Sequence, residues 1–356
     1  MSRRSIISPL QNGGIAGDWS VVTMSGATEA AYAALVAGAP ASPITHSLLW
    51  RDLLVGLGLG QPVYWLALRD GQVRAALPAF VQGSPQGAVL NSLPLVQSIG
   101  GVITAGDAAP DERAHAVRLL TGTMLAEAPA RDVRVACLVG GPYRGEGDVA
   151  SFARPPDFQL IRSTNVLDLS RPLEPRPSIT WTVRKAERLA PTHHLARTPA
   201  EARAVHDLYA ASMQRIGVTP QPWALFERLL PSARFVGAHV AGELVSALIL
   251  LVHGEVVEYH SVGNSEAGRR LQTNTWLCHR ELEWARAAGL RWWHWGVSPS
   301  PAVHDFKKRW GGADLPYPVW GWQLGPVDHW RALTPPALAA TFPGYFVLPY
   351  DQLRAP

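Results

Sequence analysis

Three apolar stretches follow one another directly in the second half of the chain, and they constrain the fold more than any other feature. Their sequences are RFVGAHV (234–240), ELVSALILLV (243–252) and EVVEYHSVG (255–263). Each stretch is rich in β-branched or aromatic residues, and a glycine lies in each gap between them. This pattern is typical of strands joined by tight turns. We therefore predict three consecutive strands, which form the centre of an α/β fold.

Helical patterns surround these strands. Thr198 and Glu201 form a capping box with a proline at the first helical position, which predicts a helix that ends near residue 215. The other expected elements are helices at about 178–190, 222–230 and 271–288, strands at 193–197, 291–297 and 318–324, and a short helix within 304–317. The order in this half is therefore strand, helix, helix, three strands, helix, strand, short helix, strand.

The first half repeats much of this order. The expected strands are at 19–23, 133–139 and 165–169, the helices at 27–37, 45–56 and 110–128, and a hairpin at 62–81 turns at Asp70-Gly71. An irregular loop follows at 91–101. The segment SRPLEPRP (170–177) has three prolines in eight residues, which favours a stiff connection between domains. We predict two domains, residues 1–170 and 171–356.

Composition excludes several classes of protein. With 47% hydrophobic and 17% charged residues, the 356-residue chain can bury a sizeable core. Its two cysteines, Cys137 and Cys278, form neither a zinc pattern nor a disulfide framework. The twelve histidines contain no helical metal-binding pair beside an acid, so we expect no metal. No apolar run approaches the ~20 residues that cross a bilayer, and residues 1–14 lack an export signal, so we expect a cytoplasmic protein.

Lysine is scarce in this chain. The net charge is +4 and the 32 basic residues include only three lysines: Lys185, Lys307 and Lys308. Two of the three lie side by side in HDFKKRWGGADLPY (304–317). The charge permits polyanionic partners without requiring them, because most of the arginines are scattered.

Four segments carry a resemblance to a known family, on the background of this element order. They are NSLPLVQSIGG (91–101), VRKAERLA (183–190), NTWLCHRELEWARAAGLRWWHWG (274–296) and HDFKKRWGG (304–312). The order resembles the Gcn5-related N-acetyltransferase (GNAT) fold, and the segments resemble the FemX/FemAB-like and BioF2-like transferases. The resemblance implies two tandem GNAT-like domains, each with a mixed, mostly antiparallel sheet flanked by helices. One position departs from the family, because His294 precedes Trp295-Gly296 where the family usually has Asp before Gly.

The resemblance implies an enzyme that forms an amide by moving an acyl or aminoacyl group to an amine. Such a reaction needs a positive or hydrogen-bonding group beside the developing oxyanion. In the family, the lysine after the signature phenylalanine lies at the donor ester, which corresponds here to Lys307 after Phe306. For Lys308 we favour a place on a solvated helix face. We expect Trp310 to lie in the core.

Proton removal has several candidates. Glu258, Tyr259 and His260 lie on the strand expected near the reaction centre, and alternation places Tyr259 on the opposite face from the other two. His294 ends the neighbouring strand. A histidine that titrates near neutral pH would suit a base, whereas strand histidines more often satisfy core hydrogen bonds. The family also admits a mechanism without a dedicated base.

Substrate contacts are implied at three places. On the helix that carries the first lysine, Arg184 and Lys185 would face the acceptor, although an exposed helix face explains them equally well. The loop 263–274 corresponds to the GNAT pyrophosphate loop, Arg/Gln-x-x-Gly-x-Gly/Ala, but lacks its second glycine. Further expected contacts are Tyr259 and Phe306 with substrate, Ser92, Gly100 and Gly101 of the 91–101 loop with substrate, and Arg269, Arg270 and Asn274 with the donor's phosphates.

The donor and acceptor remain open. Aminoacyl-tRNA is preferred as donor because the coenzyme A loop is degenerate while the Phe-Lys segment is intact, and acyl-CoA is the alternative. Either would be a co-substrate, with no permanently bound cofactor. A rival from another class is a non-catalytic double GNAT module that binds RNA or a cell-wall precursor. The acceptor would be an amine on a cell-wall precursor, polysaccharide or secondary metabolite, and we expect a monomer or weak dimer. The late tryptophans would either line an apolar pocket or pack in the core.

Overall fold

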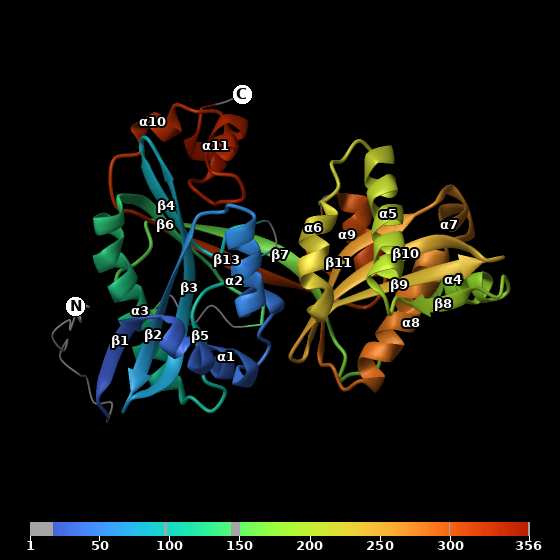
Figure 1. Ribbon diagram of the computed structural model, residues 1–356, viewed down its shortest axis with the longest axis horizontal. Coiled ribbons are helices and arrows are strands. Elements are labelled where there is room, and N and C mark those ends of the chain that lie inside the picture. The colour runs from blue at the N-terminus through green and yellow to red at the C-terminus, as the bar shows by residue number, and fades with distance from the viewer. Residues whose placement is uncertain (1–16, 96–97, 144–149, 299, 355–356) are drawn as a thin grey trace. The chain divides into compact units, whose positions relative to one another are not determined.

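The computed structural model describes residues 17–95, 98–143, 150–298 and 300–354. Residues 1–14, on which the expectation about export rests, and residues 96–97 of the 91–101 loop lie outside this range. The contacts divide the chain into two compact units, one formed by residues 1–162 with 316–356 and the other by residues 163–315 (Figure 1). None of the helices in the described ranges combines the length and apolar content that a bilayer crossing requires.

This division differs from the predicted boundary at 170/171, because the C-terminal residues join the first unit. The physical reason is the pairing of β13 (Ala313–Gln323), which lies antiparallel to β6 (Val133–Val139) over Val319–Gln323. The predicted last strand of the second half therefore completes the sheet of the first unit. Beyond it, helices α10 (Asp328–Arg331) and α11 (Pro335–Thr341) pack on the same unit.

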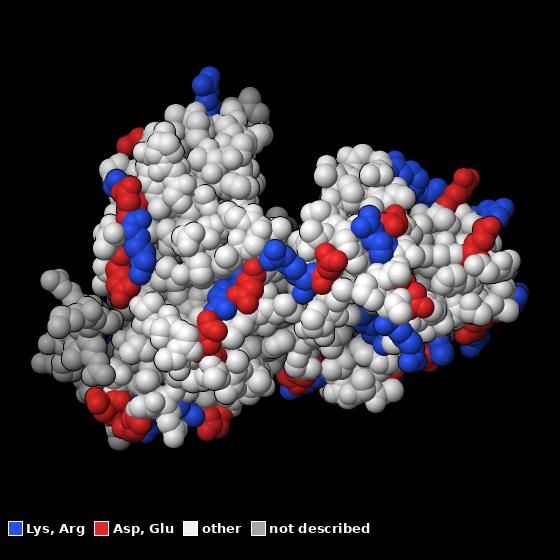
Figure 2. Space-filling model, in the orientation of Figure 1, with Lys and Arg blue, Asp and Glu red and all other residues white. Residues whose placement is uncertain are grey.

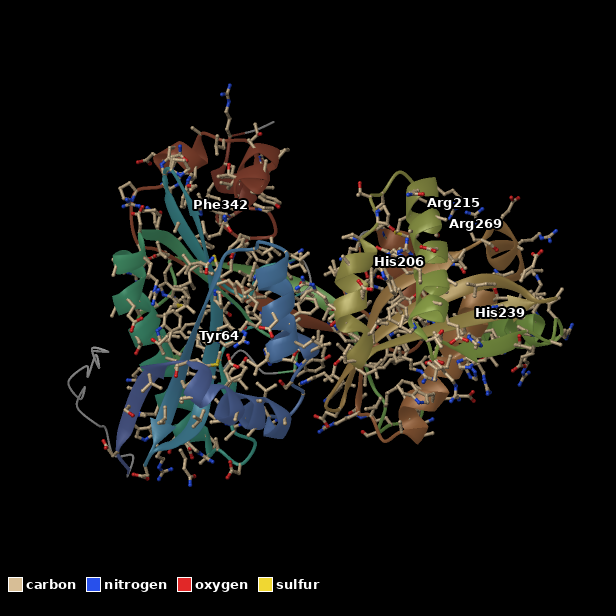
Figure 3. The ribbon with its side chains drawn as sticks, viewed as in Figure 1. Tyr64, His206, Arg215, His239, Arg269 and Phe342 are labelled. Carbon is tan, nitrogen blue, oxygen red and sulfur yellow. The ribbon has the colours of Figure 1, made fainter. Side chains whose placement is uncertain are left out.

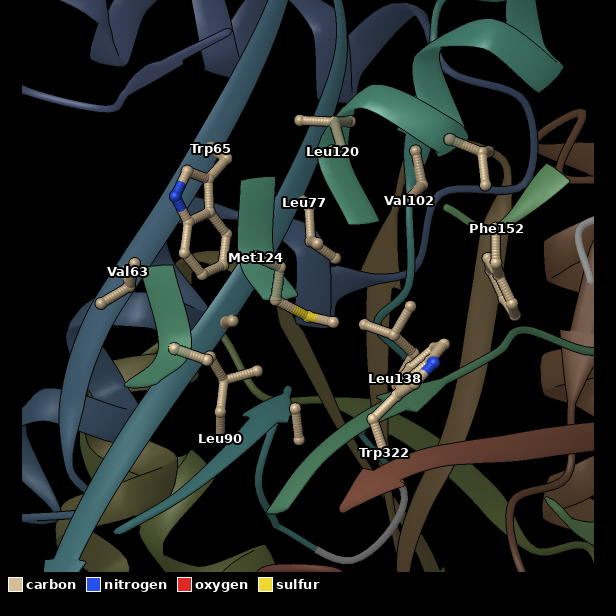
Figure 4. Close-up of a cluster of buried hydrophobic side chains, with 14 of the residues drawn as sticks. Val63, Trp65, Leu77, Leu90, Val102, Leu120, Met124, Leu138, Phe152 and Trp322 are labelled. Carbon is tan, nitrogen blue, oxygen red and sulfur yellow. The ribbon is translucent and has the colours of Figure 1, made fainter. Parts of the chain in front are cut away.

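The first unit contains a mixed sheet in the order β1-β2-β3-β4-β6-β13, with β5 paired to β3. The remaining elements are β1 (Trp19–Thr23), α1 (Glu29–Gly38), α2 (Leu48–Gly56), β2 (Gln61–Arg69), β3 (Gln72–Ser84), β4 (Gly87–Ser92), β5 (Ile103–Thr104) and α3 (Pro110–Glu127). The predicted hairpin is confirmed: Asp70 and Gly71 both have left-handed backbone angles, as its tight turn requires. The core beneath α3 is a cluster of buried side chains that includes Trp65, Met124 and Trp322 (Figure 4).

The second unit is built on the order β7-β12-β11-β10-β9-β8, in which only the β11–β12 pair is parallel. Its strands are β7 (Phe158–Asp168), β8 (Thr192–Leu195), β9 (Ala233–Val240), β10 (Glu243–His253), β11 (Val256–Asn264) and β12 (Trp292–His294). Its helices are α4 (Pro177–Glu187), α5 (Pro199–Arg215), α6 (Trp223–Leu229), α7 (Glu266–Leu271), α8 (Thr273–Ala287) and α9 (Pro301–Lys308). The predicted α/β fold and the three consecutive strands are confirmed.

Helices cover both faces of this second sheet. On one face α4 and α8 bury a cluster that includes Val236, Leu248, Tyr259 and Trp293. On the other face lie α5 and α6, where His206 of α5 packs between α6 side chains (Figure 3). The capping box that opens α5 is formed as predicted.

Several boundaries differ from the prediction, and two of them lie beside the candidate site. The expected helix at 271–288 begins at Thr273, because Gln272 has a left-handed backbone (φ 57°) that separates α8 from the short helix α7. The expected strand at 291–297 ends as β12 at His294. Trp295 still donates its N–H to the Asn165 carbonyl of β7 at 2.9 Å, and the chain turns away at Gly296, which has φ 69°.

Candidate active site

The central feature of the second unit is the place where β11 and β12 separate. Their parallel pairing covers only Val256–Glu258 opposite Trp292–His294, although β11 continues to Asn264. The strands therefore diverge beyond Glu258 and His294. These two residues are register partners, so their side chains lie next to each other on one face of the sheet.

β11 also carries one residue more than β10 at this level. Ser261 pairs with Ile249 and Tyr259 pairs with Leu250, which leaves His260 as the extra residue of a β-bulge. Bulges are over-represented next to active sites because they redirect side chains and end regular pairing. Here the bulge lies on β11 just beyond the last residue that pairs with β12.

The three adjacent candidates on β11 face as predicted. Tyr259 packs against Trp295 within the core under α8, with 5.0 Å between ring centroids. His260 faces the other way and lies edge-on to Phe226 of α6 at 5.6 Å. Glu258 shares the His260 side of the sheet, so two of the three titratable groups belong to the side that carries His294.

Glu258 is a buried carboxyl with no polar partner in the part of the chain that the structure describes. The residue is 5% exposed, and burial alone raises the pKa of its carboxyl to about 7. A carboxyl that loses its proton near neutral pH is suited to act as a general base. Burial therefore keeps Glu258 a candidate proton acceptor.

His294 belongs to a chain of hydrogen bonds that ends at Lys307. Thr164 of β7 has its Oγ1 2.9 Å from His294 Nε2 and donates to the carbonyl of Gly296 at 3.1 Å. The Lys307 ammonium donates to the same carbonyl at 3.1 Å and to that of Val297 at 2.8 Å. The network connects β7, β12 and α9 immediately beyond the end of β12.

Lys307 is almost entirely buried, with 3% of its surface exposed. Burial lowers its pKa to about 8, so the ammonium form still predominates at pH 7. An ammonium has three N–H donors, and two of them bind the carbonyls of Gly296 and Val297. Among the described residues none accepts the third, which is available for a ligand.

Burial moves the pKa of both candidate histidines away from neutral pH. Burial lowers the pKa of His260 to about 4. Burial, together with the positive charge of Lys307, lowers the pKa of His294 to about 3. Both rings are therefore neutral at physiological pH, because the interior disfavours the imidazolium. They are suited to hydrogen bonding, and Glu258 is better matched to accept a proton.

The neighbouring lysine has a different environment. Lys308 forms an ion pair with Asp314 at 2.8 Å, and its side chain is partly exposed. Asp314 also accepts hydrogen bonds from Asn165 and lies 3.1 Å from His304. Although burial opposes it, these partners lower the pKa of Asp314 to about 2. Lys308 thus joins α9 to the start of β13, away from the Lys307 network.

Four of the late tryptophans pack in two separate cores. Trp293 and Trp295 belong to the core of the second unit, where Phe306 and Trp310 lie against Trp295. Trp310 is buried, as predicted. Trp320 and Trp322 belong to the core of the first unit. Of the two roles considered for these side chains, the structure shows packing.

The α4 candidates lie on an exposed helix face. Arg184 and Lys185 are both exposed, and the Lys185 ammonium lies over the ring of Trp181, 5.2 Å from its centroid. Neither belongs to the Lys307 network. On the face of the molecule in Figure 2, basic and acidic side chains are interspersed rather than gathered by sign. A substrate contact by Arg184 or Lys185 stays a prediction.

The predicted phosphate loop is partly helical. Arg269 and Arg270 are exposed on α7, where Arg269 points outward (Figure 3). In the Arg-x-x-Gly-x-Gly/Ala pattern counted from Arg269, the two small-residue positions are Gln272 and Asn274. Gln272 keeps the left-handed backbone that a glycine would adopt, while Asn274 interacts with the hydroxyl of Tyr259. Side chains therefore occupy the places where glycines would admit phosphates.

Gly268 has a packing role that explains its presence in this loop. A Cβ at this position would lie 2.0 Å from the carbonyl oxygen of Val245. Its amide N–H is also satisfied internally, by the hydroxyl of Ser265 at 3.1 Å. The glycine permits α7 to pack on β10 and does not leave a backbone donor for a phosphate.

The candidates of the 91–101 loop belong to the first unit. Gly101 donates its amide N–H to Ser92 Oγ at 2.6 Å. A Cβ on Gly100 would lie 1.9 Å from the Ser92 carbonyl oxygen, so only glycine fits. The carbonyl of Gly100 is 3.2 Å from His46 Nε2. These contacts show how the loop is folded, and its contact with substrate stays a prediction.

Comparison with known proteins agrees with this architecture. A family model described as an acetyltransferase (GNAT) domain matches residues 176–308. No curated protein matches the sequence. The solved structure of FemX is similar, at 12% identity over 83% of this chain and 96% of that chain, with a TM-score of 0.67.

Two further solved structures have the same fold at lower similarity. The C-terminal domain of a putative lysylphosphatidylglycerol synthetase from Agrobacterium fabrum is 12% identical over 85% of this chain and 94% of that chain, with a TM-score of 0.53. A conserved protein of unknown function from Bacteroides thetaiotaomicron is 12% identical over 83% and 97%, also with a TM-score of 0.53.

The resemblance to FemX-like tandem GNAT proteins is thus confirmed at the level of the fold. The GNAT domain covers every strand and helix that contributes to the Lys307 network except β7. The match to the acetyltransferase (GNAT) family model indicates that this enzyme catalyses acyl transfer.

Sequence reasoning missed Thr164 of β7. The residue is 4% exposed, and its hydroxyl touches the network directly. It stands in a strand that pairs with β12 although the two are more than 120 residues apart in the chain. No local motif marks such a residue, because its role depends on long-range strand pairing.

Proposed function

We propose that the protein transfers an aminoacyl or acyl group from an activated donor to an amine, with the reaction at the divergence of β11 and β12. The observation that carries the proposal is the buried Lys307 ammonium, which donates to two carbonyls and whose third N–H has no acceptor among the residues that the structure describes. A preorganised donor of this kind stabilises the oxyanion of a tetrahedral intermediate and typically contributes about 10²–10³ in rate.

The reaction proceeds by addition and elimination. The amine nitrogen of the acceptor attacks the donor carbonyl, a C–N bond forms, and the carbonyl oxygen becomes an oxyanion beside Lys307. The Glu258 carboxylate takes the proton that the amine loses. When the intermediate collapses, the C–O bond of an ester or the C–S bond of a thioester breaks. The departing oxygen or sulfur then receives the proton from Glu258.

Aminoacyl-tRNA is the preferred donor. Gln272 and Asn274 stand where the GNAT pyrophosphate loop has small residues, and the Gly268 amide is already satisfied by Ser265. These features disfavour a coenzyme A cradle and leave the exposed Arg269 and Arg270 as phosphate ligands. Acyl-CoA is the alternative. The proposal includes a cytoplasmic location, where charged tRNA is available, and no permanently bound cofactor.

The acceptor in this proposal is an amine on a cell-wall precursor, a polysaccharide or a secondary metabolite. Incubation with aminoacyl-tRNAs or acyl-CoAs and a panel of such amines, followed by mass analysis for the amide, identifies both substrates. Ribonuclease treatment abolishes the activity if tRNA is the donor and leaves it intact if the donor is acyl-CoA.

The neighbouring lysines provide a matched test of mechanism. We expect Lys307→Met to lower kcat by about 10²–10³ because the oxyanion loses its donor. Lys308→Met removes the ion pair to Asp314 and should change kcat less than threefold. Equal rates for wild type and Lys307→Met would refute the mechanism. A protein that binds RNA or a precursor, but forms no amide with any donor, would instead support the rival non-catalytic module.

A further inference from the structure

The hydroxyl of Thr164 stands between two groups of the network. It lies 2.9 Å from Nε2 of His294 and 3.1 Å from the Gly296 carbonyl oxygen. Thr164, His294 and Gly296 are buried, so each polar group depends on protein partners rather than on bulk water. The position follows from β7, which runs antiparallel to β12 and pairs Val166 with His294.

The protons available in this hydrogen-bond network determine which tautomer His294 adopts. A threonine hydroxyl has one proton to donate, and a carbonyl oxygen can only accept. Because the Thr164 proton goes to Gly296, the contact with His294 requires the proton to be on Nε2 of the ring. The neutral imidazole is therefore the Nε2–H tautomer, and its Nδ1 carries the lone pair.

The same hydroxyl also acts on the segment that holds Lys307. The Gly296 carbonyl accepts hydrogen bonds from the Thr164 hydroxyl and from the Lys307 ammonium, at 3.1 Å each. Gly296 lies where the chain leaves the sheet with a left-handed backbone, so the ladder of β12 does not orient this carbonyl. Thr164 supplies the orienting contact from β7.

We propose that Thr164 is a positioning residue: its hydroxyl holds His294 in the Nε2–H tautomer and orients the Gly296 carbonyl that directs the Lys307 ammonium. The link to catalysis rests on the transfer reaction proposed for this site. The tautomer does not depend on that reaction, so it is testable in the resting protein.

A purely structural role for Thr164 makes a different prediction. Valine has the same branched shape as threonine and suits a buried strand equally well. If only shape mattered, Thr164→Val would change neither the tautomer nor the rate. If the hydroxyl matters, Thr164→Val removes the oxygen that accepts from Nε2–H of His294, whereas Thr164→Ser keeps this oxygen.

The experiment combines two readouts on wild type, Thr164→Val and Thr164→Ser. Long-range ¹H–¹⁵N spectra distinguish protonated from unprotonated ring nitrogens, and a His294→Gln variant assigns the signals of this residue. Steady-state kinetics gives kcat and KM with whichever donor supports turnover. The matched control is Thr121→Val in the first unit, because Thr121 is also fully buried and its hydroxyl bonds to Val117 and Ala153.

In wild type and Thr164→Ser we expect the Nε2–H tautomer. In Thr164→Val we expect a mixture or the other tautomer, with kcat lowered about three- to tenfold and KM unchanged, a loss that corresponds to one hydrogen bond. Thr121→Val should keep the wild-type tautomer and rate. An Nδ1–H tautomer in wild type overturns the proposal even if Thr164→Val fails to fold.

Two other results also overturn it. One is a wild-type tautomer in folded Thr164→Val. The other is a kcat in Thr164→Val equal to that of wild type despite an altered tautomer, which refutes the link to catalysis. Failure of the transfer reaction itself is distinguishable, because wild-type protein would then show the Nε2–H tautomer while no variant, wild type included, forms an amide.

Discussion

Glu258→Gln should stabilise the protein and do so more at high pH than at low pH. Glutamine resembles the protonated acid in shape and carries no charge. Glu258 is buried, and its pKa rises from 4.5 to about 7 in the folded state because burial penalises the carboxylate. A raised folded-state pKa means that the folded protein holds this proton more tightly than the unfolded chain does. The stabilising contribution of that proton is present below pH 4.5 and is lost as the pH rises through 7.

The magnitude follows from the shift. Each pH unit by which the pKa rises corresponds to about 1.4 kcal/mol, so the rise from 4.5 to about 7 lowers the free energy of unfolding by about 3 kcal/mol at pH 8.5, where both states are ionised, and by about 1 kcal/mol at pH 5. Glutamine avoids this cost. Glu258→Gln should therefore raise the free energy of unfolding by about 2 kcal/mol more at pH 8.5 than at pH 5.

Urea denaturation at the two pH values, followed by tryptophan fluorescence and circular dichroism, measures this difference. Glu227→Gln on α6 is the matched control, because that side chain is exposed and should give the same small change at both pH values. The same Glu258→Gln protein should lose transfer activity about 10²-fold or more if the carboxylate is the base. An equal stability change at pH 5 and pH 8.5 would refute the conclusion that Glu258 is buried without a compensating partner.

Three further outcomes are expected. The transfer rate, measured as kcat/KM, should follow a bell-shaped pH profile. It should rise through about pH 7 as Glu258 ionises and fall through about pH 8 as Lys307 loses its proton. A flat profile between pH 6 and 9 would contradict both roles. Glu281→Ala should lower the free energy of unfolding by about 3–5 kcal/mol, since it removes the fully buried carboxylate that binds Arg234 at 2.5 Å. Urea denaturation measures this loss, and a loss below 1 kcal/mol would show that the ion pair does not stabilise the fold. Gln272→Gly relieves the left-handed backbone and should leave stability unchanged or raise it by up to about 1 kcal/mol, whereas Gln272→Val should lower it; a Gly variant that is less stable than Val would contradict the assigned conformation.

Much of the fold was predictable because its signals are local. The three strands from 233 to 264 are separated by two turns, each with a glycine in the left-handed conformation, and such turns are recognisable from the glycine. The capping box of α5 is likewise recognisable from four consecutive residues. The boundaries that differed depend on tertiary contacts. Gln272 breaks a helix-like pattern where α7 packs on β10, and β12 stops where the chain turns at Gly296.

The candidate site likewise has features that were predictable from the sequence and features that were not. The sequence identified Lys307, Glu258 and His294 as candidates, and alternation correctly placed Glu258 and His260 on one face. It had no means of showing that Lys307 is buried while Lys308 is paired with Asp314, because adjacent residues on a helix point in different directions and their surroundings come from distant segments.

By itself, then, the sequence determined the elements, the reaction class suggested by their order, and the residue types available for chemistry. Tertiary structure alone decided how those groups are charged. The proton affinities of Glu258, His294 and Lys307 depend on how much water is excluded around them, and that exclusion is produced by packing between strands and helices far apart in the chain. Thr164 shows the same principle, since only the pairing of β7 with β12 brings its hydroxyl to His294.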